Sequence, residues 1–271
     1  MNGDDQTAAA TDWDAAQYLR FEQERTQPSR DLAARIELKD PSSVLDIGCG
    51  PGNSTHVLRE RFPAAEILGV DSSSNMIDQA RRQYPELAFE IVSLTPDCGE
   101  IGKTYDVIFS NACLQWIPDH KRLFPNLFSK LNPGGALAVQ IPMTSDMPIS
   151  AILAEMSENS PWKDKIRACR GQDLFAYPPE EYYDILSGIT EHFTIWQTSY
   201  MHVMKGCAEV VRWYCGSRLR PYLAAFSQEG KAEFLADVEN RLRQYYRPRA
   251  DGRIVIPFPR LFMIANAEVR K

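Results

Sequence analysis

Two carboxylates and three glycines stand at the ends of two apolar runs near the start of the chain. Residues 44–47 form a short apolar run that contains Asp46, and three glycines follow at alternate positions. Asp71 ends a second apolar run about 20 residues further on, the distance at which nucleoside-binding folds place an acid for the ribose. Glycine permits positive φ angles and lets a ligand approach the backbone closely. The pattern therefore predicts a nucleoside site at the carboxyl edge of a parallel sheet. The glycines are Gly48, Gly50 and Gly52.

The glycine spacing separates two classes of nucleoside. Dinucleotide sites use G-x-G-x-x-G, in which a helix N-terminus approaches a pyrophosphate. Here the spacing is G-x-G-x-G followed by Asn53, and the carboxylate of Asp46 suits a cationic ligand better than a pyrophosphate. Residues 46–52 resemble the nucleoside-binding loop of S-adenosylmethionine-dependent methyltransferases. A dinucleotide enzyme and a purely structural turn are the alternatives.

Polar and aromatic residues follow another apolar run, at residues 105–110. Carboxyl ends of strands are where such sheets carry chemistry. We expect the first two of these residues to contact the cofactor. We expect the first and the last two to line the methyl-transfer site, where the last two would position the ligands. They are Asn111, Ala112, Gln115 and Trp116.

Alternating strands and helices must position these residues. Strands that alternate with helices over about a hundred residues imply a parallel sheet covered on both faces. We therefore predict an α/β fold with a Rossmann-like, doubly wound sheet and a helical lid near the C-terminal strands. A helical leader at 12–38, interrupted at Pro28, precedes the sheet. The strands are expected at 44–47, 65–70, 88–92, 105–110, 136–141, 193–203 and within 253–267.

The helices after residue 142 suggest how the chain is divided. Segments 147–160, 163–169, 179–187, 208–214 and 228–246 have helical patterns, and we expect those between the sixth and seventh strands to form the lid that selects the acceptor. The predicted division has three parts. They are an N-terminal helical cover (1–40), a cofactor-binding core (41–145), and a lid and acceptor region with the closing strands of the same sheet (146–271).

Composition limits the partners. The chain has 271 residues and a formal charge of −6, so it has no overall attraction for nucleic acid or anionic membranes. Its six cysteines contain no C-x-x-C pair, which indicates neither a zinc site nor a disulfide framework. No apolar run reaches membrane-spanning length. We expect a soluble cytoplasmic protein without a bound metal, acting on a small molecule as a monomer or small homo-oligomer.

Further motifs carry a resemblance to one family. Together with residues 46–54 they resemble trans-aconitate 2-methyltransferases, from about Trp13 to near the C-terminus. The resemblance implies a class I methyltransferase sheet, S-adenosylmethionine as methyl donor, and a small polycarboxylic acid as acceptor. The motifs are Asp12-Trp13-Asp14, Tyr18-Leu19, Glu24-Arg25, Asp71-Ser72-Ser73, Asn111-Ala112, Leu114-Gln115-Trp116, Pro118-Asp119-His120, Ala138-Val139-Gln140, Tyr182-Tyr183-Asp184-Ile185-Leu186, Arg220-Pro221 and Pro259-Arg260-Leu261-Phe262.

The expected cofactor contacts lie on the loops after four strands. A serine is expected to cap the helix that begins near residue 73, and Met76 could lie on the adenine ring or in the core. The full set is Asp46, Gly48, Gly50, Gly52, Asn53, Asp71, Ser72, Met76, Ser93, Asn111 and Ala112.

The expected acceptor site is cationic. A carboxylate is ionised at neutral pH, so its methylation requires no general base, whereas an arginine fork fixes both its charge and its orientation. We expect Arg25, Arg220 and Arg260 to hold the acid, although each could instead be a surface or ion-pair residue. His120 would serve as a base only for a hydroxyl or amine acceptor; we expect it to cap a helix. Hydrogen bonds to the acid are expected from Tyr18, Tyr200 and His202.

Three departures from the family pattern leave alternatives open. Ser93 stands where the family has an acid, Met143-Thr144 replaces a polar pair, and Arg218 replaces a glycine. The last two lie near the expected acceptor site. A methyltransferase for a different carboxylic acid or small molecule, or a protein that binds S-adenosylmethionine without catalysis, is therefore also considered.

Overall fold

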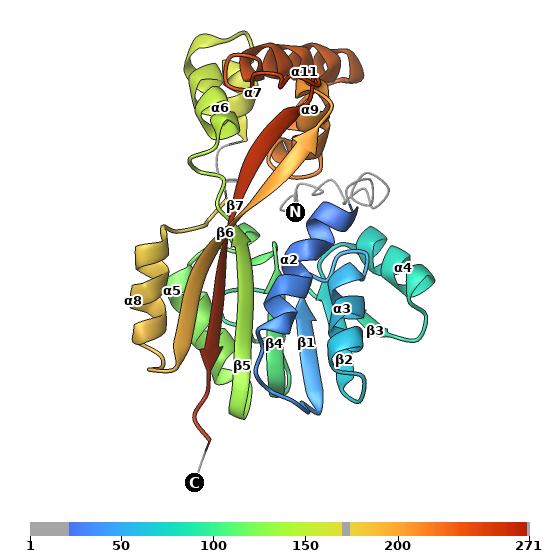
Figure 1. Cartoon of the computed structure of the whole chain (residues 1–271), viewed down its shortest axis with the longest axis vertical. Helices are drawn as coiled ribbons and strands as arrows, with labels where there is room; N and C mark the ends of the chain where they lie inside the picture. Colours follow the sequence, from blue (N-terminus) through green and yellow to red (C-terminus); the bar gives the residue numbers. More distant parts are fainter. Residues whose placement is uncertain (1–21, 170–173, 270–271) are drawn as a thin grey trace, which may run out of the picture.

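The computed structural model describes residues 22–169 and 174–269. In this part of the chain seven strands form one sheet in the order β3-β2-β1-β4-β5-β7-β6 (Figure 1). The first five strands are parallel, and β7 runs antiparallel to both β5 and β6. The predicted doubly wound α/β sheet is confirmed. Its strands are β1 (Ser43–Ile47), β2 (Glu66–Asp71), β3 (Ala88–Ile91), β4 (Tyr105–Asn111), β5 (Leu131–Pro142), β6 (Phe193–Met204) and β7 (Ile254–Asn266).

Helices cover both faces of the sheet. On one face, Leu32 of α2 (Glu22–Ala34) and Leu58 of α3 (Asn53–Arg61) pack on buried strand residues such as Phe109. On the other, α5 (His120–Ser129) and α8 (Pro179–Ser187) bury their apolar sides. The central strands are apolar on both faces because both faces are covered. Helix α4 (Ser74–Gln83) packs against the β3 edge.

A helical lid stands above the carboxyl end of the sheet (Figure 1). The strands β6 and β7 stay paired from Phe193 and Ala265 up to Met204 and Ile254, and they carry the sheet into the lid. Helices that follow β5 pack with those between β6 and β7 around a shared apolar core, so the lid is larger than the sequence indicated. Its helices are α6 (Pro148–Asn159), α7 (Lys163–Ala168), α9 (Cys207–Cys215), α10 (Arg220–Leu223) and α11 (Gln228–Leu242).

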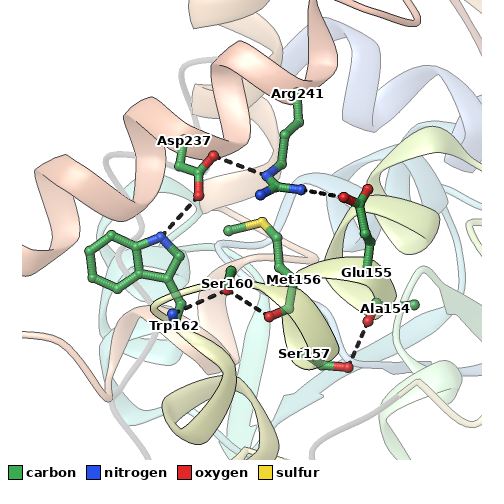
Figure 2. Close-up of polar contacts among 8 residues, drawn as sticks. All are labelled: Ala154, Glu155, Met156, Ser157, Ser160, Trp162, Asp237 and Arg241. Carbon is green, nitrogen blue, oxygen red and sulfur yellow. Dashed lines mark hydrogen bonds and ion pairs between the residues drawn. The ribbon is translucent and has the colours of Figure 1, made fainter.

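A polar clasp joins the two halves of the lid (Figure 2). Asp237 of α11 accepts hydrogen bonds from Trp162 Nε1 at 3.1 Å and from Arg241 Nε at 2.9 Å. Arg241 also donates from Nη1 to Glu155 Oε1 of α6 at 2.8 Å. The clasp therefore ties α11 to the segment that follows β5.

Helix α2 differs from the sequence expectation. Pro28 lies inside the helix, which continues to Ala34 without a break, so the predicted interruption is wrong. Proline removes a single backbone donor, and packing of the apolar side of the helix against the sheet, for example through Leu32, compensates for that loss. Of the predicted leader 12–38, residues 12–21 lie outside the described part of the chain.

None of the described helices is long and apolar enough to cross a membrane.

Candidate active site

A cavity of about 360 Å³ opens at the carboxyl ends of β1, β2 and β4. This is where the strand order reverses, because β1 has β2 on one side and β4 on the other. Open α/β sheets bind ligands at such a point. Eight of the eleven expected cofactor residues line the cavity: Gly48, Gly50, Asp71, Ser72, Met76, Ser93, Asn111 and Ala112.

The glycine loop after β1 needs its glycines for conformation and for space. Gly48, Gly50 and Gly52 have φ angles of 72°, 53° and 94°, which side chains disfavour. A Cβ atom on Gly48 would also lie 2.2 Å from Cys113 Sγ. The loop thus passes directly beneath the segment that follows β4.

Asp71 is held by backbone amides on two sides. The N–H of Gly50 donates to its Oδ2 at 3.0 Å, and the N–H of Ser73 donates to its Oδ1 at 2.9 Å. The carboxylate therefore links the tip of β2 to the glycine loop, with its position fixed at the wall of the cavity. Ser73 also accepts a hydrogen bond from the N–H of Met76, which confirms the predicted serine cap.

Asp46 does not line the cavity. It is fully buried, and its Oδ2 accepts hydrogen bonds from Ser54 Oγ at 2.6 Å and Thr55 Oγ1 at 2.7 Å. Burial raises the pKa of this carboxyl to about 6. Its role in the structure is to anchor the start of α3 beneath the glycine loop, one layer behind the position that the sequence suggested.

Gly52 and Asn53 also lie away from the main cavity. A Cβ atom on Gly52 would meet the ring of Tyr84 at 2.7 Å, and Asn53 lines a small neighbouring hollow together with Arg25. Sequence reasoning missed part of the apolar lining, because an isolated apolar residue after a strand gives no distinctive signal. The missed residues include Val92, Leu94, Cys113 and Ile117.

The segment after β4 presents two unsatisfied amide oxygens. Ala112 has a left-handed φ of 55°, held by its N–H bond to Gln140 O at 3.0 Å and by Gln115 Nε2, which donates to Ala112 O at 2.7 Å. Asn111 Oδ1 and Gln115 Oε1 are buried and have no hydrogen-bond partner among the described residues. Buried acceptors of this kind are costly, so their retention points to a ligand.

A second, narrower cavity adjoins the first. The two share Ala112 and Trp116 as walls. The described residues that line the second cavity include two arginines but no carboxylate, imidazole, amine or thiol. They are Arg25, Ala112, Gln115, Trp116, Pro142, Trp213, Gly216, Ser217, Phe258 and Arg260.

Both arginines are buried against aromatic rings. The guanidinium of Arg25 lies 5.1 Å from the ring centre of Trp213, and that of Arg260 lies 5.0 Å from the ring centre of Phe258. Their exposed fractions are 8% and 4%. Arg25 also donates to Gly216 O at 3.4 Å, and a Cβ atom on Gly216 would approach Arg25 Nη2 to 2.8 Å. The cavity thus concentrates positive charge in a protein of net negative charge.

The other expected acceptor residues are placed differently. Arg220 lines the first cavity, as Trp116 does. His202 stands behind the aromatic wall, with its ring centre 4.7 Å from that of Trp213. Burial and the charges of Arg260 and Arg25 lower the pKa of His202 to about 4, so it is neutral at pH 7.

Two tyrosines complete the expected set. The hydroxyl of Tyr200 donates to Asp31 of α2 and lines neither cavity, because that bond holds its side chain against the helix. Tyr18 lies outside the described residues.

His120 is a structural residue, and the predicted cap was wrong. It is fully buried, with Nε2 2.9 Å from Leu114 O and Nδ1 2.6 Å from Tyr182 Oη. A carbonyl can only accept, so Nε2 donates to it and Nδ1 accepts from the tyrosine. Burial lowers the pKa of His120, so its ring is neutral. The hydrogen bond with Tyr182 connects α5 to α8. Asp119, the residue at the N-cap, makes no side-chain capping bond.

Sequence comparisons extend over nearly the whole chain. Residues 18–186 match a family model described as a methyltransferase domain. A trans-aconitate 2-methyltransferase of Methylobacterium nodulans is 43% identical over 258 residues, which cover 94% of this chain and 98% of that protein. One from Rhodopseudomonas palustris is 41% identical over 255 residues, with the same coverage of each chain.

Solved structures show the same fold. The YcgJ protein of Bacillus subtilis has a TM-score of 0.54 at 14% identity, covering 90% of this chain and 99% of its own. Phosphoethanolamine N-methyltransferase 2 of Haemonchus contortus, solved in complex with S-adenosyl-L-methionine, has a TM-score of 0.51 at 18% identity, covering 90% of this chain and 52% of its own.

Proposed function

The chain belongs to the trans-aconitate 2-methyltransferase family, and from that premise we propose that it transfers the methyl group of S-adenosylmethionine to a carboxylate of trans-aconitate. One observation carries the proposal. A cavity at the switch point of the sheet joins, across Ala112 and Trp116, a second cavity that holds two buried arginines. A nucleoside donor and a polyanionic acceptor would meet at that junction.

S-adenosylmethionine fits the residues of the first cavity. Asn111 Oδ1 is a buried acceptor that lacks a donor among the described residues, and the ammonium group of the cofactor offers one. Asp71 lies at the cavity wall, where its carboxylate oxygens can accept hydrogen bonds from the ribose hydroxyls. Met76 and Ile117 offer an apolar surface for the purine, and Ser93 a hydroxyl for its amino group. When bound, the cofactor supplies an electrophilic methyl group on a sulfonium.

The second cavity suits an acceptor that is already ionised. Its described lining contains no group that could remove a proton at neutral pH, whereas Arg25 and Arg260 offer charge-assisted hydrogen bonds to carboxylates. A carboxylic acid needs no base because it is ionised at pH 7. A hydroxyl or amine acceptor would need one. The composition of the cavity therefore favours a carboxylate ester as product.

The remaining work of the chain is orientation and exclusion of water. Gln115 fixes Ala112 through its 2.7 Å bond, so the wall between the two cavities is rigid. Trp213 and Phe258 shield the arginines from solvent. Holding two reactants in line in a water-poor site is a large part of what an enzyme contributes to a displacement reaction.

The division of labour along the chain is part of the same proposal. Residues 41–145 hold the donor, residues 146–271 supply half of the residues that line the acceptor cavity, among them Trp213 and Arg260, and the N-terminal cover contributes Arg25 from α2. The acceptor would then be chosen by segments that lie outside the nucleoside-binding half.

A panel of carboxylic acids tests the proposal. We expect label from methyl-labelled S-adenosylmethionine to appear in a trans-aconitate monoester, identified by mass spectrometry and by release of methanol in base. Turnover on another acid with none on trans-aconitate would assign a different substrate. Binding of S-adenosylhomocysteine without turnover on any acid would reject catalysis.

Gly216→Ala tests the acceptor cavity without removing a charge. The new Cβ atom must displace the guanidinium of Arg25, so we expect KM for the acid to rise about tenfold while the affinity for the donor stays unchanged. Gly102→Ala is the matched control, because its Cβ atom meets no atom within 4 Å. Equal kinetics for the two variants would show that Arg25 does not hold the acid.

A further inference from the structure

We propose that Gln140 is a positioning residue for the acceptor, which acts by holding Arg260. The inference rests on the proposed function, because it takes Arg260 to be an anchor of the acid. Gln140 lies in β5 and is fully buried, and its Oε1 accepts a hydrogen bond from Arg260 Nη1 at 3.1 Å. Its side chain lines neither cavity, so a change of this side chain can reach the acid only through a neighbouring residue, and we assign that role to its hydrogen-bond partner Arg260.

The register of the sheet explains the contact. Gln140 lies opposite Phe262 of β7, and Pro142 lies opposite Arg260. Because residues two apart on a strand share a face, Gln140 and Arg260 are diagonal neighbours on one face of the sheet. The bond therefore joins two side chains that rigid strands hold in place.

The backbone of Gln140 contacts the other side of the site. Its carbonyl accepts the N–H of Ala112 at 3.0 Å, and Gln140 is the register partner of Asn111 in β4. One residue thus touches both an acceptor anchor and the wall that the two cavities share. This connection fixes how far a carboxylate held by Arg260 lies from the wall at Ala112.

The Nε2 group of Gln140 does not stabilise the fold. Its Nε2 is buried and has no hydrogen-bond partner among the described residues, which costs free energy that an apolar side chain of similar size would not cost. Methionine has a similar shape and would fill the same space. Among the described residues the side-chain amide has one hydrogen-bond partner, Arg260, and we assign it the task of holding that guanidinium.

The neutrality of the amide matters as well. A carboxylate at this position would also accept from Arg260 Nη1, but it would compensate the positive charge that the acid needs. An amide oxygen orients the guanidinium and leaves its charge available. Glutamine satisfies both requirements.

A double-mutant cycle tests the inference. The measured quantity is the Kd of trans-aconitate, by calorimetry, for protein saturated with S-adenosylhomocysteine. We expect Gln140→Met to raise Kd about tenfold, Arg260→Met to raise it further, and the double variant to match Arg260→Met alone. The Kd of S-adenosylhomocysteine should stay within about twofold in all three. The inference would be overturned if the increase in Kd of the double variant equalled the product of the two single increases. It would also be overturned if Gln140→Met bound trans-aconitate with the Kd of the wild type.

Two further variants separate positioning from stability. Val139→Ala leaves a cavity at a fully buried neighbour on the opposite face of β5; we expect it to lower the unfolding temperature without changing Kd. Gln140→Met should unfold no earlier than Val139→Ala. Gln140→Glu should weaken binding of the acid at least as much as Gln140→Met. A normal Kd for Gln140→Glu would contradict the role assigned to the charge of Arg260.

The outcomes also distinguish this inference from the proposed function. If the wild-type protein binds trans-aconitate but does not methylate it, the proposed function is rejected. The double-mutant cycle of Gln140 and Arg260 can still be interpreted in that case, because it is measured as Kd. A wild type that binds no acid overturns both.

Discussion

Two aspartates of the donor site show how environment divides one residue type between two roles. Asp71 stands at the cavity wall, where two backbone amides orient its carboxylate. Asp46 is fully buried behind the glycine loop and meets two hydroxyls, and burial raises its pKa. An ionised Asp46 destabilises the fold at neutral pH, yet it places negative charge beneath a loop that receives a cationic ligand. We attribute its retention to that charge.

Asp46→Asn should change how stability depends on pH. The folded pKa of about 6 exceeds the ordinary value of about 4, so the carboxyl contributes most below pH 4 and that contribution is lost as pH rises through 6. Two pKa units correspond to about 3 kcal/mol. Asparagine keeps an oxygen for Ser54 and Thr55 and does not titrate. Relative to wild type, the variant should therefore gain up to about 3 kcal/mol of unfolding free energy between pH 4 and pH 7.

Urea unfolding of the unliganded proteins at several pH values measures this difference. His202 acts in the opposite direction, because its lowered pKa makes it a source of stability that is lost as pH falls toward 4. It is present in both proteins and cancels when they are subtracted. A difference that stays flat from pH 4 to pH 7 would show that Asp46 titrates normally.

At the scale of elements, the strands and the glycine loop were predictable because their signals are local. Buried strands appear in the sequence as short apolar runs. The loop was predictable because glycine adopts positive φ angles more readily than any other residue. The interruption at Pro28 was predicted wrongly, because a single missing donor is outweighed by packing that the local sequence does not reveal. The origin of the lid in two separate segments could not be predicted, since it depends on contacts between α6 and α11.

Roles of single side chains were predictable only where the backbone determines them. Gly48 directly follows β1, and Asp71 and Asn111 are the last residues of β2 and β4, so their place at the sheet edge was predictable. Arg220 and Tyr200 lie in segments whose orientation depends on distant partners: Arg220 lines the first cavity, and Tyr200 is held by Asp31 of α2. Gln140 belongs to a run that carries the family resemblance, but its contact with Arg260 was not predictable, because that contact comes from the register between β5 and β7.

The clasp of Figure 2 should stabilise the lid as a unit. Asp237→Ala removes the carboxylate that accepts hydrogen bonds from Trp162 Nε1 and Arg241 Nε. The side chain of Asp237 is only 30% exposed. We expect a loss of about 1–2 kcal/mol in the free energy of unfolding, measured in urea, with an unchanged Kd for S-adenosylhomocysteine. The Kd should stay unchanged because the cavity that would hold the methyl donor is lined mainly by loops of the sheet and not by the clasp.

Glu239→Ala is the matched control on the same helix. Glu239 is 24% exposed, but its partner Arg243 is 64% exposed, whereas Arg241 in the clasp is 21% exposed. Solvent therefore screens the Glu239–Arg243 pair, and its loss should cost less than about 0.5 kcal/mol. Equal losses in the two variants would mean that the clasp contributes no more than a surface ion pair.

At the scale of the whole molecule, the second cavity joins parts that are otherwise separate. Its walls come from α2, from the segment after β4, from the lid through Trp213, and from β7 through Phe258 and Arg260. The first cavity is bounded mainly by loops of the sheet. A ligand in the first should therefore stabilise the core, whereas a ligand in the second should couple the core to the lid.

Hydrogen exchange measured by mass spectrometry can separate these two effects. S-adenosylhomocysteine alone should slow exchange in the loops after β1, β2 and β4. Addition of trans-aconitate should extend protection to α9 and to the lid ends of β6 and β7, because a ligand protects the elements whose local opening would break its contacts. In Arg260→Met the first pattern should persist and the second should weaken, since Arg260 lies in β7 and contributes to the second cavity alone. Protection of α9 by S-adenosylhomocysteine alone, with no further change when the acid is added, would show that the lid responds to the donor and that the two cavities do not divide the molecule in this way.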